Sequence, residues 1–69
     1  MTDMKARVLA VQDGGLLVRD CRTDQEVDVR TPHTFRFRPE DLVCITYDGI
    51  MTRSLPPQIR AAAIRRLPR

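Results

Sequence analysis

Four short runs of this chain have the pattern of β-strands, and in three of them the side chains divide into two faces at a period of two. That period is typical of a β-strand with one buried face, because successive side chains of a strand point to opposite sides. The pattern is clearest in EVDVR, where Val27 and Val29 share one face and the charged residues share the other. The three alternating runs and LLVRD, which follows the first of them, predict strands over residues 4–11, 15–20, 25–30 and 42–47.

Turn signals follow the first and the third of these runs. Asp13-Gly14 follows the first run, and glycine tolerates the positive φ that a tight hairpin requires. Thr31-Pro32 ends the third run, because proline lacks the N–H group that a central strand donates. We therefore expect the first three strands to form a meander.

The C-terminal segment QIRAAAIRRL is ambiguous between helix and strand. Alanine and arginine are good helix formers, and a helix would stack Ile59, Ala63 and Leu67 on one side. At a period of two, Ile59, Ala61 and Ala63 would instead share one face of a strand. A sheet of four strands would leave an open edge that invites pairing with other chains, so a closing fifth strand over 58–64 is the favoured prediction.

The stretch VCITYDGIMTRSLPPQIRA, residues 43–61, carries the most specific motif of the chain. It resembles the signature VxVxYdGxxTxSxPPqIxA of small bacterial domains of unknown function, which are OB-like β-barrels common in short proteins and lipoproteins of Gram-positive bacteria. Upstream, VLAVQDGGLLVRD is similar to the opening hairpin of that group, so the resemblance covers most of the chain. It implies that the residues after the double proline complete the barrel, and it brings no catalytic residues.

The same motif also has a direct physical interpretation. Tyr47 is in phase with Val43 and Ile45, so its ring is expected in the core with its hydroxyl at the barrel rim. Pro56-Pro57 stiffens the chain in an extended form. A polyproline ligand for another protein is the alternative, although a single Pro-Pro pair lacks the PxxP spacing.

Together these patterns predict an all-β fold, a small five-stranded OB-like barrel. The whole chain of 69 residues is expected to form one domain, because a chain of this length buries only a thin core. Residues 1–3 and 66–69 are expected to be frayed tails.

Composition places the chain among globular proteins, with 42% hydrophobic and 30% charged residues. No uncharged apolar run approaches the roughly 20 residues of a membrane span. Residues 1–5 lead into no apolar signal core, which favours a soluble, cytoplasmic protein. The resemblance points the other way, because related domains are often extracytoplasmic.

The net charge of +3 is unevenly distributed. Residues 1–48 carry seven basic and nine acidic side chains, whereas residues 49–69 carry five arginines and no acid. A basic end attracts phosphates or an acidic partner, although many such tails are simply solvated.

Catalysis and metal binding find little support in the sequence. A nucleophilic site would have to combine Cys21 or Cys44 with His33, the only histidine, and small thiols beside apolar residues are more often packed in the structure. These three residues lack metal-ligand spacing, and free thiols are expected. The acidic residues around 20–28 alternate with arginines and indicate a solvated hairpin. We predict no enzyme activity, no metal and no cofactor.

The favoured functional prediction is a non-enzymatic binding or interaction domain, through a protein partner or self-association. Self-association would use an outward set of apolar character. Its members are Leu17, Cys21, Leu42 and Cys44.

Binding of single-stranded nucleic acid is the alternative, because OB-type barrels bind single strands through aromatic stacking in a basic groove. Phe35 and Phe37 are the candidate stacking residues, although the thin core also needs them. The candidate binding residues are arginines: Arg36, Arg38, Arg53, Arg60, Arg65 and Arg66.

Overall fold

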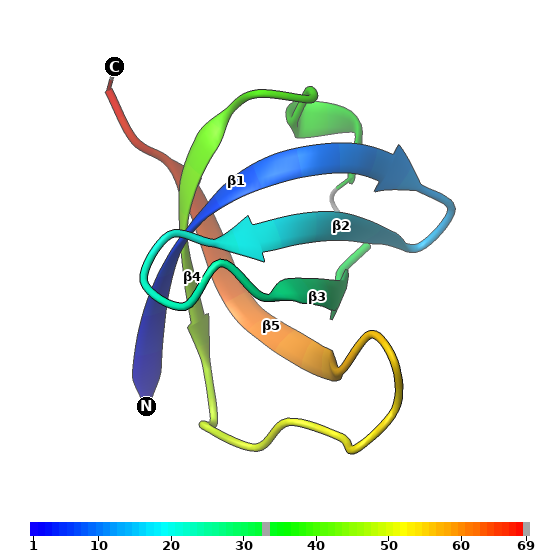
Figure 1. The fold of residues 1–69 in the computed structure, drawn as a ribbon. Coiled ribbons are helices and arrows are strands. Elements are labelled where there is room, and N and C mark those ends of the chain that lie inside the picture. The colour runs from blue at the N-terminus through cyan, green and yellow to red at the C-terminus, as the bar shows by residue number, and fades with distance from the viewer. Residues whose placement is uncertain (33, 69) are drawn as a thin grey trace.

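Five strands and one short 3₁₀ helix follow one another along the chain in the computed structural model (Figure 1). The structure describes residues 1–32 and 34–68, without the side chain of Phe35. The elements are β1 (Thr2–Gln12), β2 (Gly15–Asp20), β3 (Glu26–Arg30), η1 (Thr34–Arg36), β4 (Leu42–Tyr47) and β5 (Gln58–Arg66). All five expected strands are present, and β2 and β4 have the predicted bounds.

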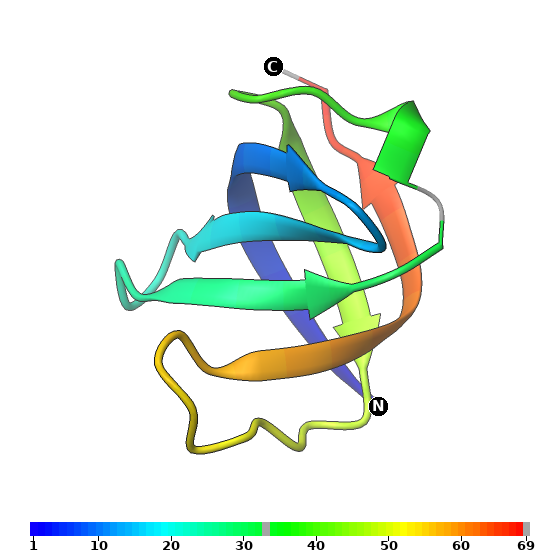
Figure 2. The same cartoon turned by 90° about the vertical axis from the view of Figure 1, so that its right-hand side faces the viewer.

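The strands close into a barrel in the order β1-β2-β3-β5-β4 (Figure 2). β1 is long enough to pair with both β2 and β4, and all neighbours are antiparallel except β3 and β5, which run parallel. The predicted five-stranded OB-like barrel is confirmed. β5 is a strand despite its helix-forming composition, because its backbone groups pair with strands on either side.

The core is built from the alternating positions of all five strands. Val27 and Val29 are fully buried, and Tyr47 is only 7% exposed. Each fully buried aliphatic side chain contributes about 1.5–3 kcal/mol relative to an exposed one. The remaining buried hydrophobic residues are Met4, Ala6, Val8, Leu16, Val18, Phe37, Val43, Ile45 and Ile59.

A β-bulge in β5 changes which residues face inward. The pairing with β4 shifts between Thr46 and Tyr47, so that Thr46 lies opposite Ala63 but Tyr47 lies opposite Ala61. As a result Ala61 and Ile64 pack against the core, whereas Ala63 is exposed. The expected face of Ile59, Ala61 and Ala63 is therefore wrong beyond Ala61, because the extra residue reverses the alternation.

The ends of the chain are more ordered than expected from the sequence. Thr2 and Asp3 belong to β1, and Thr46 Oγ1 donates a hydrogen bond to Asp3 Oδ1 at 2.8 Å. Arg66 belongs to β5, and the Leu67 amide donates to the Leu42 carbonyl at 2.8 Å. Pairing with β4 therefore replaces the expected fraying at both ends, and Arg69 lies outside the described residues.

Gly15 is predicted to be intolerant of any side chain. A Cβ at this position would lie 2.6 Å from the Val29 carbonyl oxygen on β3. We expect Gly15→Ala to lower the free energy of unfolding by about 1–3 kcal/mol, because the β2–β3 pair must move apart. Urea denaturation is the measurement. Gln12→Ala is the control on the partner strand, and an equal loss in both variants would contradict the steric account.

Candidate binding groove beside β5

β5 extends beyond the end of its neighbour β3. The parallel pairing runs from Asp28 opposite Gln58 to Arg30 opposite Arg60, and β5 continues for six more residues. At Thr31-Pro32 the chain leaves β3 and leads toward η1, near the C-terminal end of β5 (Figure 2). Within the described residues, no strand pairs with β5 on this side beyond Arg60.

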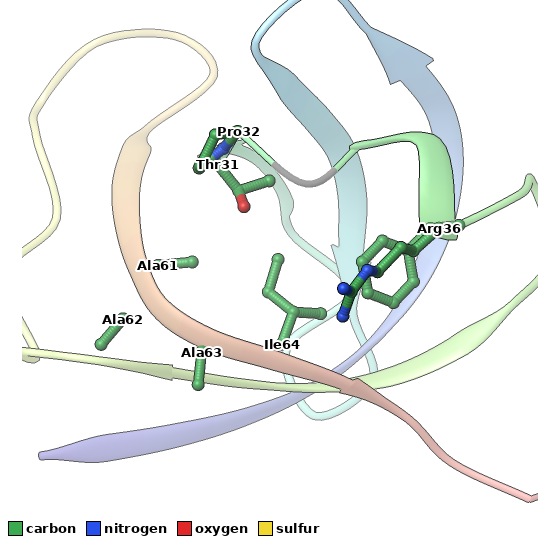
Figure 3. Close-up of a pocket in the computed structure, with 8 residues that line it drawn as sticks. Thr31, Pro32, Arg36, Ala61, Ala62, Ala63 and Ile64 are labelled. Carbon is green, nitrogen blue, oxygen red and sulfur yellow. The ribbon is translucent and has the colours of Figure 1, made fainter.

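Three adjoining cavities follow this edge, and we call them together the β5 groove. The central cavity has a volume of about 240 Å³ and lies between Thr31-Pro32, Arg36 and the end of β5 (Figure 3). The second, of about 430 Å³, shares Thr31, Pro32 and Ala61 with the first. The third, of about 520 Å³, shares Arg36 with it. The lining residues are Gly14, Arg30, Thr31, Pro32, Arg36, Phe37, Arg38, Asp41, Arg60, Ala61, Ala62, Ala63, Ile64 and Arg66.

The groove has a strongly positive lining. Its described residues include five arginines and one carboxylate, Asp41. In the part of the chain that the structure describes, no carboxylate lies within ion-pair distance of Arg38 or Arg60. Clustered charge of one sign in a concave surface attracts ligands of the opposite sign.

Arg66 closes one end of the groove. Its Nε lies 3.1 Å from Asp41 Oδ2, and its Nη2 donates to the Arg36 carbonyl. Its guanidinium carbon lies 5.9 Å from the centre of the Phe37 ring, within the range of a cation–π contact. Arg66 therefore ties the end of β5 to η1, and its role is structural as well as electrostatic.

Arg30 marks the opposite end. Its guanidinium lies across the β1–β2 turn, where a Cβ on Gly14 would come within 2.9 Å of Nη2. Arg30 Nη1 is also 3.7 Å from Asp28 Oδ1. The glycine-rich turn thus provides the space in which this arginine reaches the groove.

The structure brings together four of the six candidate arginines. Arg36, Arg38 and Arg66 line one cavity, and Arg60 lines the cavity at the other end of the groove. The remaining two lie outside the lining of these cavities: Arg53 is exposed in the loop after β4, and Arg65 lies opposite Cys44.

Sequence reasoning missed Arg30, together with the small and apolar residues of the central cavity. Arg30 lies beside Arg60 only because β3 and β5 run parallel, and no local pattern gives that register. The one available signal was Thr31-Pro32, which marks where β3 stops.

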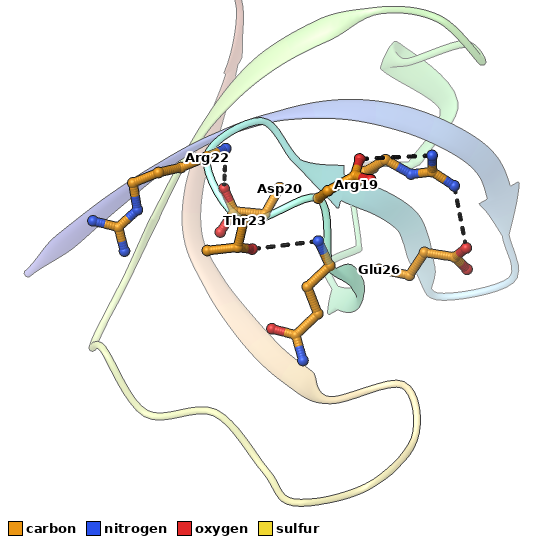
Figure 4. A network of polar contacts seen from close by, with 7 residues as sticks. Arg19, Asp20, Arg22, Thr23 and Glu26 are labelled. Carbon is orange, nitrogen blue, oxygen red and sulfur yellow. Dashed lines mark hydrogen bonds and ion pairs between the residues drawn. The ribbon is translucent and has the colours of Figure 1, made fainter.

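The outer face of β2 and β3 is balanced in charge, unlike the groove. Arg19 lies 3.3 Å from Glu26 and 3.7 Å from Asp24 (Figure 4). The β2–β3 connection is held by its own polar groups, because the Arg22 amide donates to Asp20 Oδ1 at 2.8 Å. This agrees with the predicted solvated hairpin.

The aromatic side chains that the structure describes are buried in the core. Phe37 and Tyr47 are each 7% exposed, so neither presents a ring face for stacking. The side chain of Phe35 lies outside the described residues. A stacking platform of the kind used for single-stranded nucleic acid is therefore absent from the aromatic rings that the structure describes.

The outward apolar set does not form one patch. Cys44 lies between Lys5 of β1 and Arg65 of β5, and Leu42 lies opposite Arg7. Leu17 lies on another strand, opposite Asp28. Charged residues thus interrupt the surface that was expected to support self-association.

The specific motif residues organise the loop between β4 and β5. The Gln58 amide donates to Thr52 Oγ1 at 2.8 Å, and the Thr52 amide donates to the Gln58 carbonyl at 3.0 Å. Ser54 Oγ lies 2.6 Å from Thr52 Oγ1 and donates to the Pro56 carbonyl. Pro57 is buried, and its carbonyl accepts the Asp28 amide of β3 at 2.8 Å. The motif therefore shapes the crossover into β5, in agreement with its architectural interpretation.

Thr52 is expected to stabilise this loop through its hydroxyl. Thr52→Val keeps the shape but removes the acceptor for the Gln58 amide, which should lower the free energy of unfolding by about 1 kcal/mol. Thr52→Ser retains the hydroxyl and should recover most of that loss. Thermal or urea unfolding measures both, and equal stability of the valine variant and the native protein would contradict the assigned hydrogen bond.

Other classes of site find no support among the described residues. Within 1–32 and 34–68, no group of three or more His, Cys, Asp or Glu side chains is placed to hold a metal ion. Cys21 and Cys44 are both free thiols, and His33, the only histidine that a nucleophilic site could use, lies outside the described residues. None of the described segments forms a helix that is long and apolar enough to span a membrane.

Comparison with protein-family models, with curated proteins and with solved structures found no match for this chain. The resemblance of residues 43–61 to a family signature therefore stays a prediction. The candidate function rests on the geometry of the barrel itself.

Proposed function

We propose that this domain is a non-enzymatic binding module that recognises an acidic protein partner in the β5 groove. The observation that carries the proposal is the excess of positive charge in the groove, which is lined by five arginines and one carboxylate. Arg30 and Arg66 each have an ion-pair partner, whereas among the described residues no carboxylate lies within ion-pair distance of Arg38 or Arg60. Such a surface accelerates encounter with a negatively charged partner and selects against basic ones. A cytoplasmic location remains part of this proposal.

Single-stranded nucleic acid is the second candidate, because phosphates also complement arginines. It is less favoured, since the rings of Phe37 and Tyr47 are buried and the face of β2 and β3 carries Asp28 and Glu26. Self-association through the groove is disfavoured for a different reason: a second copy would bring arginines against arginines.

Three labelled probes of similar size separate these candidates: the peptide acetyl-EVEVEVE-amide, the peptide acetyl-KVKVKVK-amide and an oligothymidylate. Fluorescence anisotropy at low salt should show binding of the acidic peptide, no binding of the basic one, and weakening as salt is added. Tighter binding of the oligothymidylate than of the acidic peptide would overturn the proposal in favour of nucleic acid. Failure of the acidic peptide to bind would overturn it altogether.

A pair of double variants tests the location. Arg36→Glu/Arg60→Glu reverses two charges in the groove, and we expect at least about a tenfold loss of affinity, because attraction becomes repulsion at both positions. Arg53→Glu/Arg65→Glu changes the net charge equally but outside the groove. Equal losses in the two double variants would contradict a groove-specific site.

A further inference from the structure

The edge of β5 offers unpaired main-chain groups to the groove. The Leu67 amide bonds to the Leu42 carbonyl, and in an antiparallel pair every second residue faces the partner strand. Leu67 and Arg65 therefore direct their main-chain groups toward β4. Ile64 directs its N–H and C=O in the opposite direction, toward the groove, where no described strand pairs with it.

An exposed strand edge of this kind is a template for another strand. Most proteins block such edges with charged side chains, prolines or a covering segment. Beyond Arg60, β5 instead carries three consecutive alanines, whose small side chains leave the backbone accessible. The edge is thus accessible beside the central cavity, which the three alanines help to line.

The central cavity supplies a place for one side chain of an added strand. Ile64 of β5 and the side chain of Arg36 lie next to each other in its lining, with Thr31 and Ala61 on the other side of the view (Figure 3). At about 240 Å³ it is large enough for an aliphatic side chain, and Phe37 is one of its lining residues. Because alternate residues of a strand share a face, the neighbouring side chains of a bound peptide would point outward, toward the rim.

Arginines at the rim of the groove favour acidic residues at those outward positions of the peptide. Arg30 and Arg60 lie at one end of the edge and Arg38 at the other. Alternating acidic side chains would pair with these arginines, whereas a second copy of β5 would present further arginines. A nucleic acid strand would satisfy the charges, but it has no alternating N–H and C=O groups to pair with β5.

We propose that the partner binds as an extended acidic segment that adds a sixth strand to the barrel along β5, with an apolar side chain in the central cavity. This inference rests on the proposed function and specifies its mode. Main-chain hydrogen bonds would give affinity, while the cavity and the arginines would give sequence preference.

Backbone methylation of the acidic probe tests the mode without changing its charge. The probes are acetyl-EVEVEVE-amide, the same peptide N-methylated on every valine, and the same peptide N-methylated on every glutamate. In an added strand only one of these two sets of amides faces β5, so we expect one methylated peptide to bind at least about tenfold more weakly and the other to bind as the parent does.

The identity of the sensitive set also gives the strand direction. Ile64 turns its side chain into the cavity and its main-chain groups toward the groove, so in antiparallel pairing the opposing valine bonds directly to it. Loss on valine methylation therefore means an antiparallel strand, and loss on glutamate methylation means a parallel one; either result supports strand addition. Equal affinities of both methylated peptides, whether at the parent value or equally weakened, would overturn strand addition while leaving the acidic groove in place. Failure of the parent peptide to bind would instead overturn the proposed function.

Discussion

Replacing Ile45 with alanine is expected to lower the free energy of unfolding by about 2–5 kcal/mol, the largest stability effect that we predict for a single substitution. Ile45 is fully buried in β4 and lies between Met4 of β1 and Ile64 of β5. A cavity at this point would loosen the packing of β4 against both β1 and β5. At about 0.05–0.15 kcal/mol per residue, a domain of 69 residues has a free energy of unfolding of roughly 3–10 kcal/mol, so the variant should lose a large share of its stability.

Ile50→Ala is the matched control, because it makes the same chemical change at a side chain that is 71% exposed. It should change the free energy of unfolding by less than about 0.5 kcal/mol. Urea denaturation followed by circular dichroism measures both variants. Comparable losses would mean that Ile45 does not lie at the centre of the core.

Asp41→Ala is expected to cost about 1.5–3 kcal/mol of unfolding free energy. The Asp41 side chain is 13% exposed, and its Oδ2 accepts the Arg38 amide at 3.0 Å and Arg66 Nε at 3.1 Å. Hydrogen bonds to a charged group are the stronger kind, and the alanine variant would leave both donors without this acceptor. The end of β5 should then detach from the segment after η1.

Asp13→Ala is the control for removing a carboxylate, since Asp13 is exposed at the β1–β2 turn. Asp41→Asn keeps an acceptor oxygen without the charge, and it should fall between the alanine variant and the native protein. Urea denaturation again provides the measurement. An Asp41→Ala variant as stable as Asp13→Ala would contradict the assigned role of Asp41 in holding Arg38 and Arg66.

Much of the fold was predictable because alternation of apolar residues is a local signal. Val27 and Val29, and likewise Val43 and Ile45, are buried as their spacing predicted. The strand state of residues 58–64 was predicted through topology and the family resemblance, since the helix propensity of the alanines and arginines points the other way, and β5 extends two residues further than predicted. Closing the sheet outweighs that propensity, because it pairs the backbone of β5 with both β3 and β4.

The groove was less predictable, because it depends on distant parts of the chain meeting. The basic character of the last third was visible in the sequence, and four of the six candidate arginines do line the groove. Arg30 enters it through a parallel register with Arg60, and the bulge in β5 turns Ile64 rather than Ala63 toward the core. Neither the register nor the bulge has a signature in local residue spacing.

The central claim is that an acidic, extended segment binds along the free edge of β5. The most direct measurement is a two-dimensional ¹H–¹⁵N NMR titration of the labelled domain with acetyl-EVEVEVE-amide. We expect saturable shifts of the Ala61, Ile64 and Arg36 amides, and slower hydrogen exchange of the Ile64 amide once it gains a partner. Shifts confined to Arg19 and Glu26 on the β2–β3 face, with the β5 amides unchanged, would contradict the claim.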